Sequence, residues 1–270
     1  MNKKYLIIMI AVIGVIGVFV ALGVKKINSG ASFTGNSSAR NLFNQARQLE
    51  AKGSLFEAKL LYQKLVNDFP ESPKVADLEK RAEEINVKLL FSPVITPQSI
   101  LYQIKPGDTL DKIARFYKTT TELIMKSNNI TNQSLIIPGS KIKIWNVPFN
   151  ILVNKSQNIL LLKSDEEIFK TYIVSTGKNN CTPTGTFKVV NKLPHPTWFK
   201  AGAIVPAQSP ENVLGTRWMG FDLAGYGIHG TTEPKDLGKQ VTQGCVRLSN
   251  SDVEELYSII PVGTEVTIIN

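Results

Sequence analysis

The two segments Ile228-His229-Gly230-Thr231 and Thr242-Gln243-Gly244-Cys245-Val246-Arg247-Leu248 determine how the carboxyl-terminal half of this 270-residue chain is interpreted. A cysteine becomes a nucleophile when a histidine removes its proton, and a third group must hold that imidazole in the right tautomer. The chain has two histidines, and the other one, His195, lies between two prolines in a loop that cannot aim a base rigidly. His229 and Cys245 are therefore the predicted catalytic pair, with purely structural roles as the alternative at this point.

Gly244 lies directly before the cysteine and permits a tight turn. Such a turn can direct the backbone N–H groups of Gly244 and Cys245 at one point, which an oxyanion hole for acyl transfer requires. We therefore expect these two N–H groups to form the oxyanion hole.

The sequence around these segments alternates apolar and polar residues in short runs separated by turns, which predicts strands. The expected strands are residues 151–153, 159–162, 169–175, 185–190 and 265–269. One helix is expected at residues 251–258, with Ser249 or Asn250 available to cap it. Residues 149–270 are thus predicted to form a mainly β domain.

This domain resembles the L,D-transpeptidase (YkuD-type) catalytic domain, through the two segments above and three further motifs at residues 174–178, 182–187 and 212–219. The resemblance implies that the histidine and cysteine strands meet at one end of a sheet. It implies that Cys245 attacks a tetrapeptide stem of peptidoglycan and forms a thioester. His229 would be the base, and the Gly230 carbonyl would orient its imidazole. A side-chain amine of a neighbouring stem would then form the cross-link.

The resemblance also implies a substrate cleft that includes Arg247, Thr231, Gln243, Thr242 and Trp218. Arg247 is expected to hold a stem carboxylate through a bidentate contact, with a structural salt bridge as the equal alternative. Gln243 departs from the family, which usually has a histidine there. Glutamine can donate a hydrogen bond but cannot carry charge or shuttle a proton, so the departure bears on the rate and the choice of acceptor.

The chain contains only two cysteines, and its two histidines are scattered, so no metal-ligand cluster and no cofactor are expected. Cys181 is interpreted as an incidental loop residue. A regulatory disulfide between Cys181 and Cys245 is the alternative in an oxidising compartment.

A smaller module is predicted at residues 101–146, beginning with the pattern Tyr-x-Ile-x-x-Gly-Asp-Thr-Leu. A strand, two helices near 111–117 and 121–128, and a closing strand at 141–145 are expected, with Asp108 or Thr109 capping the first helix. This βααβ module resembles a LysM domain, which implies binding of the glycan chains of peptidoglycan. The implied glycan-binding residues are Gly107, Asp108, Thr109, Leu110, Asn128, Ile130 and Pro138.

Residues 39–91 have apolar positions at three- and four-residue steps, which predicts three amphipathic helices. The spacing of Ala46, Gly53, Ala58, Tyr62 and Pro70 resembles a tetratricopeptide-type hairpin. Fewer than three such repeats cannot bury a solenoid core. A helical spacer, or an element that binds a protein partner, therefore remains the alternative.

The amino terminus is basic and is followed by an uncharged apolar stretch at residues 5–24. That stretch is long enough to cross the roughly 30 Å hydrocarbon layer, and its flanks favour a transmembrane anchor at residues 1–26 over a cleaved signal peptide. Linkers at 27–38 and 92–100 complete a multidomain chain. The catalytic domain is then expected outside the cytoplasm, in the cell envelope.

The formal net charge of +9 favours acidic partners, such as the carboxylates and anionic polymers of a cell envelope. No dense Lys/Arg run is interleaved with aromatic residues, so no nucleic-acid partner is expected. The predicted function is cross-linking of stem peptides by an L,D-transpeptidase. The alternatives are a wall-editing hydrolase that uses water as the acceptor, and a non-catalytic wall-binding scaffold.

Overall fold

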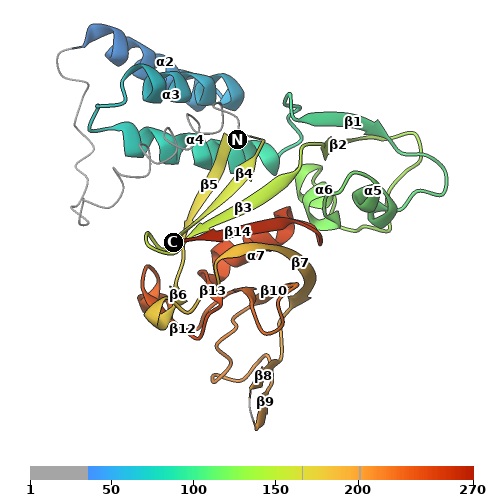
Figure 1. The fold of residues 1–270 in the computed structure, drawn as a ribbon. Helices are drawn as coiled ribbons and strands as arrows, with labels where there is room; N and C mark the ends of the chain where they lie inside the picture. Colours follow the sequence, from blue (N-terminus) through green and yellow to red (C-terminus); the bar gives the residue numbers. More distant parts are fainter. Residues whose placement is uncertain (1–35, 166, 201) are drawn as a thin grey trace, which may run out of the picture. The chain divides into compact units, whose positions relative to one another are not determined.

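The computed structural model describes residues 36–165, 167–200 and 202–270 (Figure 1). The described residues divide into two compact units, one ending at Ile85 and the other beginning at Asn86. The predicted membrane-spanning stretch at residues 5–24 lies outside the described residues. Within the part of the chain that the structure describes, no helix combines the length and apolar character needed to cross a membrane.

The three predicted helices of the first region are confirmed as α2 (Ser37–Ala51), α3 (Leu55–Asp68) and α4 (Val75–Leu90). Asn36 caps α2 by accepting a hydrogen bond from the Ala39 N–H at 3.1 Å. The Tyr62 hydroxyl on α3 donates to Glu50 on α2 at 2.9 Å, and Arg81 on α4 forms an ion pair with the same carboxylate. A polar network and a small apolar core thus hold the first unit together. The core residues are Ala39, Ala46, Ala58, Tyr62, Leu65, Leu78, Ala82 and Ile85.

The small module has the predicted βααβ order. Strand β1 (Ser99–Gln103) pairs antiparallel with β2 (Lys141–Trp145), and α5 (Leu110–Phe116) and α6 (Thr121–Ser127) lie between them in sequence. Thr109 caps α5 by accepting from the Lys112 N–H at 3.2 Å, so of the two predicted caps it is Thr109 that acts. The core of the module is Ile104, Leu110, Ile113, Ala114, Ile124, Ile142 and Ile144.

The large sheet has eight strands in the order β13-β11-β10-β7-β14-β3-β4-β5. The pairs β11–β13 and β14–β3 are parallel, and the others are antiparallel. The strands are β3 Phe149–Asn154, β4 Ile159–Ser164, β5 Glu167–Ile173, β7 Gly185–Pro194, β10 Arg217–Phe221, β11 Gly227–His229, β13 Val246–Arg247 and β14 Glu265–Ile269. All five expected strands are therefore present, whereas β10, β11 and β13 were not predicted because they are short and carry little alternation.

Two small ribbons accompany the sheet. Strand β6 (Thr176–Gly177) pairs parallel with β12 (Gln240–Thr242), and β8 (Trp198–Lys200) forms a hairpin with β9 (Ala203–Val205). The predicted helix is α7 (Asn250–Ile259), and Ser249 caps it by accepting from the Asp252 N–H at 3.1 Å.

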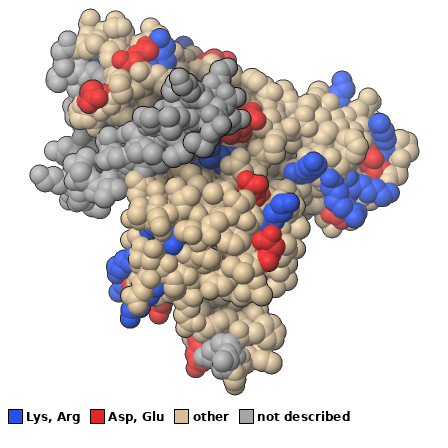
Figure 2. All heavy atoms as spheres, in the orientation of Figure 1, with Lys and Arg blue, Asp and Glu red and all other residues tan. Residues whose placement is uncertain are grey.

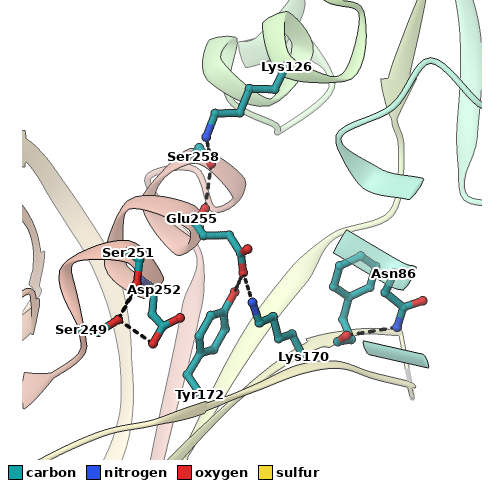
Figure 3. Close-up of polar contacts among 10 residues, drawn as sticks. Asn86, Lys126, Lys170, Tyr172, Ser249, Ser251, Asp252, Glu255 and Ser258 are labelled. Carbon is teal, nitrogen blue, oxygen red and sulfur yellow. Dashed lines mark hydrogen bonds and ion pairs between the residues drawn. The ribbon is translucent and has the colours of Figure 1, made fainter. Parts of the chain in front are cut away.

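Helix α7 connects the sheet with the small module (Figure 3). Glu255 on α7 accepts from Lys170 at 2.6 Å and from Tyr172 at 2.8 Å, both on β5. From the small module, Lys126 of α6 donates to the Ser258 hydroxyl at 3.0 Å. The Thr120 hydroxyl donates to the Ser258 carbonyl. The small module is thus hydrogen-bonded to α7, the helix that packs on the sheet.

The two parts also share one hydrophobic core. Leu90, Leu123 and Trp145 are buried in the same cluster as the apolar residues of the sheet. The Trp145 ring stacks on Phe149 at 5.3 Å and meets Phe169 edge-on at 5.6 Å. The small module is therefore packed against the β domain and does not stand apart from it.

We predict that Trp145→Ala destabilises the whole second unit. Truncation of a buried aromatic residue typically costs about 3–5 kcal/mol, and Trp145 is only 7% exposed. Urea unfolding followed by circular dichroism measures the loss. Phe116→Ala is the matched control, because this ring of the same module is 79% exposed and its loss should change stability by no more than about 0.5 kcal/mol. A separate early transition of the small module, with the sheet's midpoint unchanged, would contradict the shared core.

Candidate active site

The predicted pair lies on two neighbouring parallel strands. Strand β11 ends at His229, and β13 begins directly after Cys245. The register places Ile228 beside Val246 and His229 beside Arg247, and the Leu248 N–H donates to the His229 carbonyl at 2.9 Å. The sheet thus brings together two segments that are separated in the sequence.

His229 is held in one tautomer. Its Nδ1 atom lies 2.7 Å from the Gly230 carbonyl oxygen, which can only accept, so Nδ1 carries the proton and Nε2 is free to act as a base. The imidazole is 3% exposed and stacks against the Trp218 ring at 6.0 Å. The pKa of His229 is lowered to about 4, chiefly by burial and in smaller part by the charge of Arg247, against the opposing effect of the hydrogen bond to Gly230. The imidazole is therefore neutral at physiological pH.

Cys245 is half-buried, and its thiol faces the Gly225 carbonyl at 3.5 Å. Burial raises the pKa of the Cys245 thiol, while the Gly227 backbone hydrogen bond and the charge of Arg247 act in the opposite direction. The resting pair is thus a neutral thiol and a neutral imidazole. Such a pair needs proton transfer to the base during attack, in contrast to a preformed thiolate–imidazolium pair.

The turn before the cysteine is set by Thr242 and Gly244. The Thr242 hydroxyl donates to the Cys245 carbonyl at 2.7 Å and accepts from the Gly244 N–H at 3.2 Å. Gly244 has a φ of +124°, and a Cβ there would lie 2.6 Å from the Tyr226 ring, so only glycine fits.

This geometry bears on the expected oxyanion hole, which stays a prediction. The Gly244 N–H already donates to Thr242, so it is not a free donor. Of the two predicted groups, only the Cys245 N–H has no hydrogen-bond partner among the described residues. The sequence does not indicate that the Thr242 hydroxyl accepts a hydrogen bond from the Gly244 N–H, because that contact depends on the conformation of the turn.

Arg247 forms the structural salt bridge that the sequence left as an alternative. Its side chain is 8% exposed, and Nη1 lies 3.3 Å from a Glu233 carboxylate that is itself 59% exposed. The buried Nε atom of Arg247 has no hydrogen-bond partner within the described part of the chain. Thr231 is buried, and its hydroxyl accepts from the Glu233 N–H at 2.9 Å. Arg247 and Thr231 therefore both hold Glu233 in the loop that follows His229.

The remaining predicted residues of the cleft, Gln243 and Trp218, lie beside Cys245 and His229 respectively. Gln243 is exposed, next to the catalytic cysteine in sequence. Trp218 lies on β10 opposite His229, and its Nε1 donates to Asn191 at 3.0 Å. Cys181 is exposed, and both cysteines are free, so the alternative of a disulfide is not realised in this structure.

Some of the predicted glycan-binding residues of the small module are exposed, and the others contact other parts of the module. Gly107, Thr109 and Pro138 are exposed. Leu110 is 1% exposed, and its side chain lies in the core of the module. The Asn128 side chain bonds to the Ile124 carbonyl and to both backbone groups of Lys143.

Asp108 and Ile130 also have structural partners. Asp108 accepts from the Tyr102 hydroxyl at 2.7 Å and from the Lys105 N–H at 2.8 Å, which lowers the pKa of its carboxyl. Ile130 packs against the core of the module. These two residues therefore shape the loops of the module, in addition to any contact with sugar.

Asn250 lies near the site, although the sequence indicated it only as a possible helix cap. Ser249 takes that role, and the Asn250 side chain instead accepts from the Thr231 N–H at 3.0 Å and the Thr216 N–H at 3.2 Å. In the sequence, only Gly215 and Gly230, the two glycines that leave space for the Asn250 side chain, could have indicated this role of Asn250.

We predict that His229 makes the folded protein acid-sensitive. The unfolded chain protonates this imidazole near pH 6.5, but the folded chain does so only near pH 4. The contribution of His229 to stability is therefore complete above pH 6.5 and is lost as the pH falls toward 4, by about 3 kcal/mol at 1.36 kcal/mol per pKa unit. Thermal and urea unfolding between pH 7 and 4 should show a shallower loss for His229→Gln than for the unchanged protein.

The second histidine provides the control for this prediction. His195 is exposed, so His195→Gln should leave the pH dependence of stability unchanged. Equal acid sensitivity of the unchanged protein and His229→Gln would show that His229 is not buried in its neutral form.

Comparison with known families agrees with both modules. Residues 148–268 match the model of the L,D-transpeptidase catalytic domain, and residues 102–145 match the LysM domain. The putative L,D-transpeptidase YkuD of Bacillus licheniformis is 36% identical over 177 residues, covering 63% of this chain and 98% of the relative. The protein of the same name from Bacillus subtilis is 35% identical, with the same coverage.

A solved L,D-transpeptidase from Mycobacterium smegmatis aligns with 50% of this chain and 65% of its own, at 20% identity and a TM-score of 0.39. The family assignment follows from the two Bacillus relatives, which this chain covers almost completely. The chain belongs to the L,D-transpeptidase family, with a LysM domain preceding its catalytic domain.

Proposed function

We propose that this enzyme cross-links peptidoglycan stem peptides through a thioester on Cys245, with His229 as the base. The observation that carries the proposal is the parallel pairing of β11 with β13, together with the 2.7 Å contact between His229 Nδ1 and the Gly230 carbonyl. The pairing holds His229 at the end of one strand and Cys245 directly before the neighbouring strand. The contact leaves Nε2 as the basic nitrogen of the imidazole.

In the first half-reaction, the Cys245 sulfur attacks the carbonyl between the third-position diamino acid and D-Ala. His229 takes the thiol proton at Nε2, and the Cys245 N–H donates to the developing oxyanion. The C–N bond then breaks, the D-Ala amine takes the proton from the imidazolium, and a thioester remains. The low pKa of His229 makes its imidazolium a strong acid for this second transfer.

In the second half-reaction, the side-chain amine of a neighbouring stem attacks the thioester. His229 accepts a proton from that amine, the carbon–sulfur bond breaks, and the thiol is restored. Water in place of the amine would give hydrolysis instead. The choice between the two acceptors depends on which one reaches the half-buried Cys245 first.

We assign Arg247 and its neighbours to the substrate cleft. The Arg247 side chain is 8% exposed, whereas the carboxylate of its partner, Glu233, is 59% exposed and can turn into solvent. A stem carboxylate can therefore replace Glu233 as the acceptor for the largely buried guanidinium. Trp218 covers one face of His229, and Thr242, Gln243 and Thr231 border the cysteine and the loop after the histidine.

The LysM domain supports association with the cell wall, and we propose that it holds the glycan strand while the catalytic domain acts on the attached stems. Lys and Arg gather over this module in Figure 2. Seven basic and three acidic residues occur in residues 101–146, which favours an anionic polymer. Glycan contact is assigned to the exposed loops with Gly107, Thr109 and Pro138.

The amino-terminal part is assigned on sequence grounds. Residues 5–24 would anchor the enzyme in the cytoplasmic membrane with the catalytic domain outside. Helices α2 to α4 would act as a tetratricopeptide-like spacer or as a docking element for a protein partner.

The test of catalysis is mass spectrometry of tetrapeptide dimers from peptidoglycan after incubation with the purified protein. We expect new cross-links between two third-position diamino acids, together with an acyl-enzyme adduct on Cys245. Cys245→Ala should abolish both, since it removes the nucleophile. Cys181→Ser is the matched control and should retain both, because Cys181 is exposed and serine keeps a donor toward the Thr242 carbonyl, which lies 4.0 Å from the Cys181 sulfur.

Other outcomes assign other functions. Shortened stems without new cross-links would make the enzyme a hydrolase that uses water as the acceptor. Unchanged peptidoglycan, with glycan binding retained, would leave a wall-binding scaffold.

A further inference from the structure

Asn250 contacts the peptide group that orients the catalytic histidine. The peptide bond between Gly230 and Thr231 has two hydrogen-bonding groups. Its carbonyl oxygen accepts from His229 Nδ1 at 2.7 Å, and its N–H donates to the Asn250 Oδ1 atom at 3.0 Å. Asn250 is thus one peptide group away from the imidazole.

The same oxygen atom also holds the strand that precedes the site. Asn250 Oδ1 accepts from the Thr216 N–H at 3.2 Å, and Thr216 directly precedes β10, the strand that pairs with β11. The His195 N–H in turn donates to the Thr216 carbonyl at 2.9 Å. One side-chain oxygen therefore joins the loop after His229 to the start of the neighbouring strand.

The surrounding backbone leaves space for this side chain and for little else. A Cβ at Gly230 would lie 2.2 Å from Asn250 Oδ1, and a Cβ at Gly215 would lie 2.3 Å from it. Such approaches do not occur between real atoms, so both positions must be glycine while Asn250 occupies its place. The site is built around the amide oxygen.

Asn250 is itself held in position by α7. It is the first residue of the helix, and Ser249 caps the helix beside it. Figure 3 shows Ser249, Ser251 and Asp252 joined by hydrogen bonds at this end of α7. Val253 and Leu256 anchor the helix in the core of the domain. The oxygen of Asn250 is therefore presented from a rigid element.

We infer that Asn250 is a positioning residue that fixes the tautomer of His229. By accepting from the Thr231 N–H, it sets the plane of the 230–231 peptide and so directs the Gly230 carbonyl at Nδ1. Without that acceptor the peptide can rotate, Nδ1–H loses its partner, and the tautomer with the proton on Nε2 becomes populated. That tautomer cannot accept the thiol proton at Nε2. The inference rests on the proposed role of His229 as the base.

The test uses the full chain with Cys181→Ala and His195→Gln as background, so that one imidazole and one thiol remain. Asn250→Leu keeps the approximate size of the side chain but removes the acceptor. Asn250→Asp keeps the acceptor oxygen and serves as the conservative rescue. Ser249→Ala removes the helix cap without touching Thr231 and serves as the matched structural control.

Nitrogen-15 NMR of labelled histidine reports which ring nitrogen carries the proton. We expect the unchanged background, Asn250→Asp and Ser249→Ala to show the proton on Nδ1, and Asn250→Leu to show a mixture. The rate of Cys245 alkylation by iodoacetamide at pH 7 should fall about tenfold or more in Asn250→Leu alone, as part of the roughly 10² to 10⁴ that a positioned base supplies.

Two results would overturn the inference. One is a single Nδ1–H tautomer and an unchanged alkylation rate in Asn250→Leu. The other is an equal loss in Ser249→Ala, which would point to helix integrity instead. Neither measurement uses peptidoglycan, so failure of cross-linking in a separate assay is distinguishable from failure of this inference.

Discussion

The active site depends on one parallel strand contact, in which β11 and β13 pair Ile228 with Val246 and His229 with Arg247. The base lies at the last residue of one strand, and the nucleophile lies directly before the other. A bridge on the far side fixes β13 in turn, because Ser175 and Arg247 exchange both backbone hydrogen bonds, at 2.8 and 2.9 Å. The two-residue strand is therefore held on both edges, and Cys245 has a defined position despite lying in a turn.

The electrostatics of the site follow from the same packing. His229 ends a strand whose three residues are all buried, and desolvation disfavours its charged form. Desolvation acts on the Cys245 thiol as well, and it disfavours the thiolate. Arg247, opposite His229, favours the thiolate and disfavours the imidazolium. Both charged forms of a resting ion pair are thus disfavoured overall, so the proton is expected to move only when a substrate is attacked.

The sequence predicted the elements with strong patterns and the chemistry carried by residue type. Strand β4 is a run of apolar residues and β14 alternates buried and exposed positions, while α5 and α7 have hydroxyl caps, so local rules find these elements. The strands β11 and β13 have three and two residues, too few for any periodicity. They exist because the sheet supplies hydrogen-bond partners, which is a tertiary effect. The same limit applies to the Gly244 N–H and to Asn250, whose partners lie elsewhere in the fold.

Local sequence patterns also could not predict that the LysM domain packs against the catalytic domain. The residues before it contain two prolines and little periodicity, so a linker was expected at 92–100, yet β1 already begins at Ser99. Leu90, Leu123 and Trp145 enter the core of the catalytic domain instead of closing off a separate module. A flexibly tethered module would raise the local concentration of substrate over a wide range of positions. A module that shares the core of the catalytic domain would present the loops proposed to bind glycan at a fixed distance and angle from Cys245. Such an arrangement favours stems at one spacing along a bound glycan strand, so the packing of Trp145 bears on substrate selection as well as on stability.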